Sequence, residues 1–245
     1  MRWLGFVSCF FLLVPLQPGC IIGPTADVAA NGVVVAAPSN PAWTPYVGGF
    51  QAGVALARPV SLSDLESNLV DADSVWLEVD GAVAELSEEG TGLYAYNGNP
   101  IALAEGAEVA LHALVEGEQG SVSVTMPAAP DLSTLPNDHD ADSDLVIDLR
   151  GLDITLAYGT LVDSEGNVVW DDRPTSADDV VWDLKDAREE LNYVFPASAF
   201  TPGRYYSLAL TVIRGANGPD YDNLEAFWSN YGVGAIGNGI IVTAP

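Results

Sequence analysis

Positive charge is nearly absent from this chain. Its 245 residues hold a single lysine, Lys185, and 8 lysines and arginines in all, against 34 aspartates and glutamates, which gives a net charge of −26. A field of this sign repels phosphate backbones and anionic lipid head groups, so we predict no nucleic-acid partner. The same excess of acid favours solubility and suits a salty exterior, where repulsion within the protein is screened.

Cysteine and histidine are also scarce. Cys9 and Cys20 both lie in the first 20 residues, so the body of the protein has no thiol, and its stability must come from packing rather than from disulfides. The two histidines, His112 and His139, are far apart in the sequence. A serine or cysteine triad needs a histidine base that a third group orients, and a zinc site needs several convergent ligands. We therefore predict that the protein is not an enzyme.

What the sequence does contain begins with an export signal. Arg2 precedes an apolar run of 14 residues, 3–16, which matches a secretory hydrophobic segment and is too short to span a bilayer as a helix. The run is followed by Gln17-Pro18-Gly19-Cys20, in which a reactive thiol coincides with the cleavage point. This stretch resembles the lipobox of bacterial lipoproteins.

The resemblance implies a signal peptide over residues 1–19 and a lipid on Cys20. In lipoproteins of this type the cysteine is diacylated, the leader is cut before it, and the acyl chains hold the protein at a membrane. Ile21 after the cysteine, in place of aspartate, implies the outer membrane. We therefore expect a cell-envelope protein whose membrane partner is bound through Cys20. The alternative is an ordinary secreted protein that is cut near Gly19 and carries no lipid.

The body of the chain has the two-residue periodicity of β-strands. Apolar and polar residues alternate from Ser74 to Asp80, and the pattern recurs between glycine-rich turns such as the tight hairpin predicted at Asp80-Gly81. Short strands at this spacing predict antiparallel sandwiches. The predicted strands are 74–80, 82–86, 109–115, 122–126, 145–149, 154–162, 168–170, 180–184, 206–212, 224–228 and 239–243. Short helices are predicted at 61–69 and 183–191.

Changes in composition divide the chain into parts. The segment after Cys20 is rich in alanine, glycine and proline and is predicted as a tether, with an edge strand at 32–36. The segment 129–144 interrupts the strand pattern with prolines and aspartates. Such a composition is typical of a domain boundary. We therefore predict an all-β fold of two antiparallel β-sandwiches. The predicted parts are a signal peptide (1–19), a tether (20–45), a first sandwich (46–128), an Asp/Pro-rich linker (129–144) and a second sandwich (145–245).

A second resemblance lies near the C-terminus. The segment Phe200-Thr201-Pro202-Gly203-Arg204-Tyr205-Tyr206-Ser207-Leu208-Ala209-Leu210 is similar to the strand entry of fibronectin type III domains, with an apolar residue, a proline and a tyrosine at even spacing. Tyr206 matches the tyrosine whose hydroxyl ties down the preceding loop in immunoglobulin-like folds. Arg204 stands at the family's threonine and Leu149 at its buried tryptophan, so the implied fold is the broader immunoglobulin-like class.

Five residues with the same spacing as in this segment occur 97 positions earlier in the chain. An offset of this size equals one sandwich domain and favours a tandem pair. Leu103, Gly106, Val109, Leu111 and Ala113 align with Phe200, Gly203, Tyr206, Leu208 and Leu210.

Four alternate aspartates in the predicted linker are the candidate metal site. Calcium loops place oxygen ligands at alternate positions near their start. Ser143 replaces the turn glycine of an EF-hand and Leu149 its bidentate glutamate, so a curled loop would have to gather the carboxylates around the ion. The alternative is a solvated acidic linker, and no other cofactor is expected. The four residues are Asp138, Asp140, Asp142 and Asp144.

The segment Gly232-Val233-Gly234-Ala235-Ile236-Gly237 spells the dinucleotide-binding fingerprint. That site requires a helix whose amino end meets the pyrophosphate and an acidic residue about 20 positions later. Only eight residues follow Gly237, so we interpret these glycines as a turn before the last strand.

Aromatic residues supply the last candidate. If they gathered on one flat face they would stack on sugars, whereas burial would make them packing residues. They are Trp76, Trp170, Trp182, Tyr221, Trp228 and Tyr231. The whole pattern predicts a non-catalytic structural or interaction role in the cell envelope, with an envelope protein or a glycan as partner. A carbohydrate- or calcium-binding surface module is the alternative.

Overall fold

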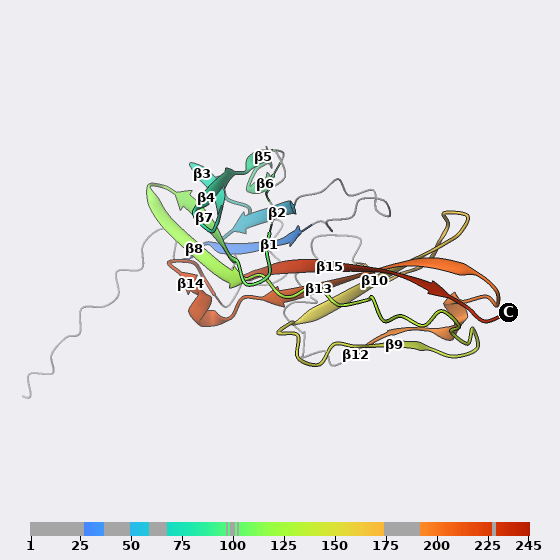
Figure 1. Ribbon diagram of the computed structural model, residues 1–245. Helices are drawn as coiled ribbons and strands as arrows, with labels where there is room; N and C mark the ends of the chain where they lie inside the picture. The colour runs from blue at the N-terminus through green and yellow to red at the C-terminus, as the bar shows by residue number, and fades with distance from the viewer. Residues whose placement is uncertain are drawn as a thin grey trace, which may run out of the picture.

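The computed structural model describes residues 27–36, 50–58, 68–96, 98, 101, 103–173, 192–226 and 229–245. This part of the chain is all-β, with antiparallel sheets in a sandwich-like arrangement, which confirms the predicted fold class. The molecule is elongated, and its longest strands run along its length (Figure 1). None of the described residues forms a helix long and apolar enough to cross a bilayer.

The strands form three sheets. An eight-stranded sheet has the order β11-β10-β13-β15-β1-β2-β6-β5, a five-stranded sheet the order β14-β8-β7-β3-β4, and a two-stranded sheet pairs β12 with β9. The five-stranded sheet lies at one end of the molecule and the two-stranded sheet at the other (Figure 1). The strands are β1 (Ala29–Ala36), β2 (Phe50–Ala57), β3 (Ser74–Val79), β4 (Ala82–Glu85), β5 (Ser87–Gly90), β6 (Leu93–Ala95), β7 (Glu108–Val115), β8 (Glu118–Thr125), β9 (Leu145–Asp148), β10 (Leu156–Asp163), β11 (Val168–Asp171), β12 (Asn192–Phe195), β13 (Tyr205–Gly215), β14 (Tyr221–Asp222) and β15 (Asn230–Val242).

Alternation along each strand builds the core. In β3 the side chains of Val75, Leu77 and Val79 are buried, and every second residue faces outward. Burial of an aliphatic side chain of this size contributes about 1.5–3 kcal/mol to the stability of the fold. The longer strands β7 and β13 repeat the same alternation of buried and outward residues. The hairpin predicted at Asp80-Gly81 is present, with φ of 46° and 81° at the two residues. This is the left-handed conformation that a two-residue turn requires.

Strand β15 joins the two halves of the chain. Its first half pairs in parallel with β1, from Asn31 opposite Asn230 to Val35 opposite Gly234, and almost its whole length pairs antiparallel with β13. β1 therefore lies inside the eight-stranded sheet, and the prediction of an edge strand there was wrong. β14 likewise pairs with β8 across the predicted linker. The division into two domains stays a prediction. Across the predicted boundary, β1 pairs with β15 and β14 pairs with β8.

The predicted linker is folded onto β15. Leu132 is buried, and the segment runs so close to β15 that a Cβ at Gly237 would lie 2.4 Å from the Pro130 carbonyl oxygen. A Cβ at Gly239 would lie 2.4 Å from Cδ1 of Leu135. The glycines predicted as a turn therefore lie inside a strand. That interpretation was wrong. Glycine is needed at these positions because the segment 130–135, about 100 residues earlier in the chain, packs directly against them.

The 97-residue repeat marks locally equivalent positions. Gly106 and Gly203 both have positive φ, 80° and 69°, immediately before β7 and β13. Their amide groups donate to carbonyl oxygens just beyond the neighbouring strand, Gly106 to Met126 at 3.0 Å and Gly203 to Ala244 at 2.8 Å. Only glycine adopts this conformation without strain, so the same residue is required at both places.

The hydroxyl of Tyr206 makes the predicted contact with the preceding loop. It accepts a hydrogen bond from the Thr201 amide at 2.7 Å. The Thr243 hydroxyl donates to the Thr201 carbonyl at 2.7 Å and accepts from the Arg204 amide at 2.9 Å. The loop 201–204 is thus held by the side chains of two neighbouring strand residues.

Other local predictions have mixed outcomes. Residues 224–226 form no strand, although one was predicted at 224–228; Leu224 instead packs against Gly120 of β8. β12 was not predicted. Most of the predicted helix at 61–69, the whole helix at 183–191 and the strand at 180–184 lie outside the described residues.

Gly237→Ala should destabilise the protein by about 1–3 kcal/mol, because the added methyl group meets a backbone oxygen that cannot rotate away. Gly53→Ala is the matched control, since a Cβ there has nothing within 4 Å. We expect it to be neutral or to stabilise by about 0.5 kcal/mol. Urea unfolding of the three proteins measures both effects. Equal stabilities for the two variants would contradict the close approach of Pro130.

Tyr206→Phe should cost about 1–2 kcal/mol, because the Thr201 amide loses its acceptor while the ring stays in place. Tyr205→Phe removes the same hydroxyl from the neighbouring residue, whose side chain is 62% exposed, and should change stability by less than about 0.5 kcal/mol. Thermal and urea unfolding of the pair decide this, and a larger loss at position 205 would contradict the assignment.

Candidate functional site

An apolar area lies on the outer side of the eight-stranded sheet. Since Tyr206 and Leu208 face the core, Tyr205 and Ser207 face outward. The register places Ser207 in one row with outward residues of β15, β10 and β11, and Tyr205 beside Val242 in the next row. We call this area the outer patch, and it consists of Val162, Val168, Tyr205, Ser207, Ile240 and Val242.

The outer patch is open to solvent. Tyr205 is 62% exposed, Val168 58% and Ile240 48%, which is unusual for large apolar side chains in one cluster. Farther along the same outer face the side chains are covered, and Leu156, Tyr158 and Ile213 form a small buried cluster with Val33. Exposed apolar side chains on this face thus lie in the outer patch and at Leu93 of β6, which is 42% exposed near the opposite edge of the sheet.

The outward side chains of β10, β13 and β15, on the face that carries the outer patch, include no carboxylate, lysine, arginine or histidine. The next outward row holds Thr160, Ala209 and Asn238, and the row after it, with Thr211 and Ile236, already reaches the covered Tyr158. In a chain with a net charge of −26, a neutral surface of this extent is a specific feature. It can bind a neutral, apolar partner and offers no ion pair to a charged one.

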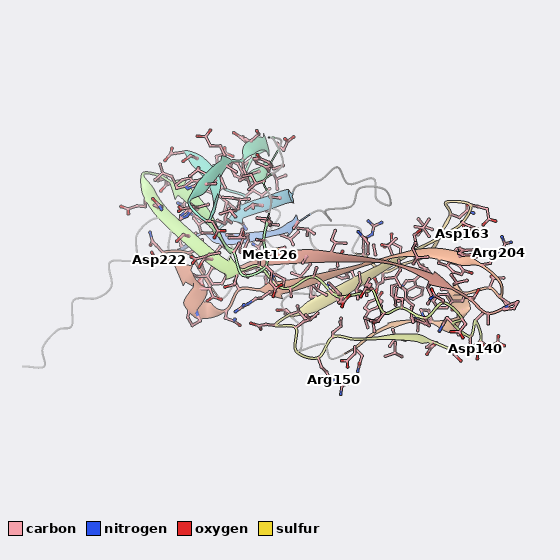
Figure 2. The ribbon with its side chains drawn as sticks, in the orientation of Figure 1. Met126, Asp140, Arg150, Asp163, Arg204 and Asp222 are labelled. Atoms are coloured by element: carbon pink, nitrogen blue, oxygen red, sulfur yellow. The ribbon has the colours of Figure 1, made fainter. Side chains whose placement is uncertain are left out.

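Charged groups stand at the rim of the outer patch and are already paired. Arg204 forms an ion pair of 2.6 Å with Glu165, and Arg173 one of 2.7 Å with Asp171. Asp163 accepts the amides of Glu165 and Asn167, and the Asn167 side chain and amide hold the pKa of its carboxyl below the usual range. Asp163 and Arg204 lie at one end of the molecule and Asp222 at the other (Figure 2).

A partly buried hydrogen-bond network fixes the edge strand β11 next to the outer patch. Asp172 accepts the Gly159 amide at 2.7 Å and the Tyr193 hydroxyl, which in turn accepts from Nε1 of Trp170 at 3.1 Å. Burial raises the pKa of Tyr193, so the phenol keeps the proton that it donates. The network joins β10, β11 and β12, and it holds Val168 and its neighbours in a defined position.

The outer face of the five-stranded sheet has a different character. Trp76 and His112 stack with ring centroids 5.0 Å apart and planes at 12°. Nε2 of His112 lies 3.6 Å from a Glu78 oxygen, and Nδ1 lies 3.2 Å from the Gln119 amide nitrogen. Burial lowers the pKa of His112, against the opposing attraction of Glu78. The row continues with Ser121 of β8, so this face is polar and acidic.

The four aspartates of the predicted calcium site do not gather around one point. Asp140 accepts the Asp142 amide and the Ser143 hydroxyl, both at 3.0 Å, and these bonds hold its pKa below the usual range. Asp144 accepts the Ala197 amide at 2.8 Å. Across the described ranges, no three histidine, cysteine or carboxylate side chains are placed to hold a metal ion. Asp138 completes the predicted set, and calcium binding stays a prediction without convergent ligands.

The aromatic candidates do not share a face. Tyr231 is 1% exposed, Trp170 and Tyr221 are partly buried against the core, and Trp76 lies on the outer face of the other large sheet. Trp182, Trp228 and the lipidation candidate Cys20 lie outside the described residues.

The sequence did not lead us to predict the outer patch. Its signal was the run of uncharged residues at every second position of 205–213 and 236–242.

No protein-family model matches this chain, and no curated protein matches its sequence. Its function is therefore argued from its own residues and their geometry.

Acid should destabilise the fold through His112. Its pKa in the folded protein lies below the usual value of 6.5, so the unfolded chain binds the proton more readily. The free energy of unfolding therefore falls as the pH drops below about 6.5. His112→Gln should flatten this slope between pH 7 and pH 5, and Glu78→Gln should steepen it by removing the opposing attraction. Urea midpoints across this range provide the measurement. Identical slopes in all three proteins would contradict the role of His112.

Proposed function

We propose that this protein is exported, carries a lipid on Cys20 and has a non-catalytic interaction role at the outer membrane of a bacterial cell envelope. The observation that supports the interaction role is the outer patch, an exposed apolar surface on a chain with a net charge of −26. Exposed patches of this kind mark interaction sites more often than chance placement of apolar residues.

The geometry of the N-terminus agrees with such an anchor. Ala29, the first residue of β1, is nine residues after Cys20, so the lipid lies within about 32 Å of the start of β1. β1 begins beside Asn230, and the outer patch includes Ile240, ten residues further along the same strand. At about 3.3 Å per residue, the patch lies about 33 Å from the anchored end. An acyl-anchored chain can therefore hold the outer patch away from the bilayer.

A carbohydrate-binding module is the second candidate. Trp76 on the outer face of the five-stranded sheet favours it, because the aromatic ring stands among the side chains of Gln119, Ser121 and Glu78. His112 covers one face of that ring, which leaves a single face for a sugar. We rank this candidate below the interaction role for that reason.

The anchor has a direct test. In a bacterial host that processes lipoproteins, mass analysis of the mature protein should find an acylated N-terminus at Cys20, and globomycin should leave the leader attached. Cys20→Ser should abolish acylation and, because the leader is cut only after the cysteine is diacylated, should leave the leader attached. Cys9→Ser changes the other cysteine, inside the predicted leader, and should leave lipidation unchanged. A wild-type product that starts elsewhere without acyl groups would refute the anchor.

A further inference from the structure

β15 pairs with β13 along almost its whole length, but its other side is only partly covered. There its pairing with β1 ends at Val35 opposite Gly234, and β15 runs on past the end of β1 (Figure 1). The next pairing on that side is the isolated parallel bridge between His139 and Thr243. Among the described residues, no strand lies along β15 between these two points. We call this stretch the β15 edge and define it as residues 236–242, which at about 3.3 Å per residue span about 23 Å.

The hydrogen bonds show which backbone groups face the β15 edge. The Thr243 amide donates to the Arg204 carbonyl at 2.9 Å, so the odd-numbered residues of β15 are bonded to β13. The register between β13 and β15 is continuous, so the even-numbered residues turn their amides and carbonyls to the opposite side. The Val242 carbonyl agrees with this direction, because it accepts from the His139 amide at 2.9 Å.

Backbone donors and acceptors along this edge are left without partners. Within the part of the chain that the structure describes, no hydrogen bond reaches the amides and carbonyls of Asn238 and Ile240 or the amide of Val242. Burial changes at the same place. Residues 231–235 are buried, whereas Asn238 is half-buried and Ile240 is exposed. The backbone groups of the β15 edge are therefore within reach of a molecule from the solvent.

The β15 edge lacks the features that usually protect the edge of a sheet. Its residues carry no charge, include no proline and form no bulge with β13. The outer strands of the eight-stranded sheet differ, since β11 ends in Asp171, β5 contains Glu88 and Glu89, and both strands pair with a register shift. The outer strands of the five-stranded sheet, β4 and β14, are only four and two residues long. An edge without such protection is a template for pairing with another extended chain.

The geometry of the unpaired groups selects an extended peptide. Those of Asn238 and Ile240 repeat at about 6.7 Å along the strand, and an extended backbone offers donors and acceptors at the same spacing. An acyl chain has no such groups, and a helix bonds its own backbone internally. Ile240 is 48% exposed on the outer face, so an apolar side chain of the added strand contacts it there.

Charge narrows the class of peptide. Asp138 and Asp140 are exposed on either side of His139, which closes one end of the β15 edge. The whole chain has a net charge of −26. A peptide with basic residues at its ends is therefore attracted, whereas an acidic peptide is repelled.

We propose that the β15 edge binds an extended peptide segment of another protein, with basic residues at its ends, by strand addition. The segment takes the place in the sheet between Val35 and His139, and its backbone pairs with Asn238 and Ile240. In this mode main-chain hydrogen bonds give affinity, and side chains select among sequences. The inference specifies a partner for the interaction role proposed above and so rests on that role, but it does not depend on the lipid.

The probe is a synthetic peptide of seven residues with blocked termini, which has a lysine at each end and alternating valine and threonine between them. Calorimetric titration of the purified wild-type protein should give a Kd on the order of 100 µM, as expected of a few main-chain hydrogen bonds to a preformed sheet. A peptide with glutamate in place of both lysines should bind roughly tenfold more weakly in about 0.05 M salt. The two peptides should differ by less than about threefold in about 0.5 M salt, because salt screens the charges.

Methylation of the peptide nitrogens separates strand pairing from apolar adhesion. Alternate N–H groups of an extended peptide face the sheet and the others face away. N-methyl groups on every second residue should therefore abolish binding in one of the two phases and leave the Kd within about threefold in the other. Equal effects in both phases overturn strand addition.

Two variants at one position test the edge itself. Asn238→Pro removes an amide that faces the β15 edge and none that is bonded to β13, and it should weaken binding about tenfold or more. Asn238→Ala changes the same side chain but keeps the amide, and it should leave the Kd within about twofold. Circular dichroism and urea unfolding confirm that both are folded. If Asn238→Pro does not fold, the methylated peptides decide the question on the wild-type protein.

A variant of the outer patch separates the two surfaces. Val168 is 58% exposed on β11, at the opposite edge of the sheet from the β15 edge, so Val168→Ser should leave peptide binding unchanged. Loss of binding in Val168→Ser but not in Asn238→Pro overturns strand addition and assigns the peptide to the outer patch. A wild-type protein that is acylated at Cys20 and binds no peptide overturns strand addition and leaves the anchor standing. Binding that Asn238→Pro removes, in a protein that is never acylated, supports strand addition and overturns the anchor.

Discussion

The structure depends on the pairing of β15 with strands on both of its sides. β1 lies against one edge and β13 against the other, and the segment around Pro130 crosses its glycines. β15 is therefore hydrogen-bonded to β1, the first described strand, and to β13 in the C-terminal part of the chain. Its inward side chains also belong to the core. A sheet assembled from strands so distant in sequence closes late in folding, because the long loop between them must be ordered first.

The residues that alternate within one strand were predictable, and the pairing of distant strands was not. Val75, Leu77 and Val79 show their buried face in a six-residue window, and Tyr206 shows its role in a short motif. No local pattern connects Val33 with Gly232, although they are paired in the sheet. The outer patch is equally hidden, because Ile240 and Val168 come into one row only through the register of four strands.

The acidic composition also has a local structure that counting charges does not reveal. Each arginine in the described ranges has a carboxylate partner: Arg58 with Asp27 and Glu116, Arg150 with Asp148, Arg173 with Asp171, Arg204 with Glu165 and Arg214 with Asp153. Exposed pairs of this kind stabilise by about 0–1 kcal/mol each, so they do not hold the fold together. With 34 aspartates and glutamates against 8 lysines and arginines in the sequence, ions from the solvent must balance most of the negative charge.

The central position of β1 determines how the protein carries mechanical load. A pull on the chain before Asp27 acts along β1, which is hydrogen-bonded to β2 on one side and to β15 on the other. The two ladders are then strained in shear, so many hydrogen bonds resist together, whereas an edge strand would peel away one bond at a time. A protein tethered by this end resists extraction by force with its most extensively bonded sheet.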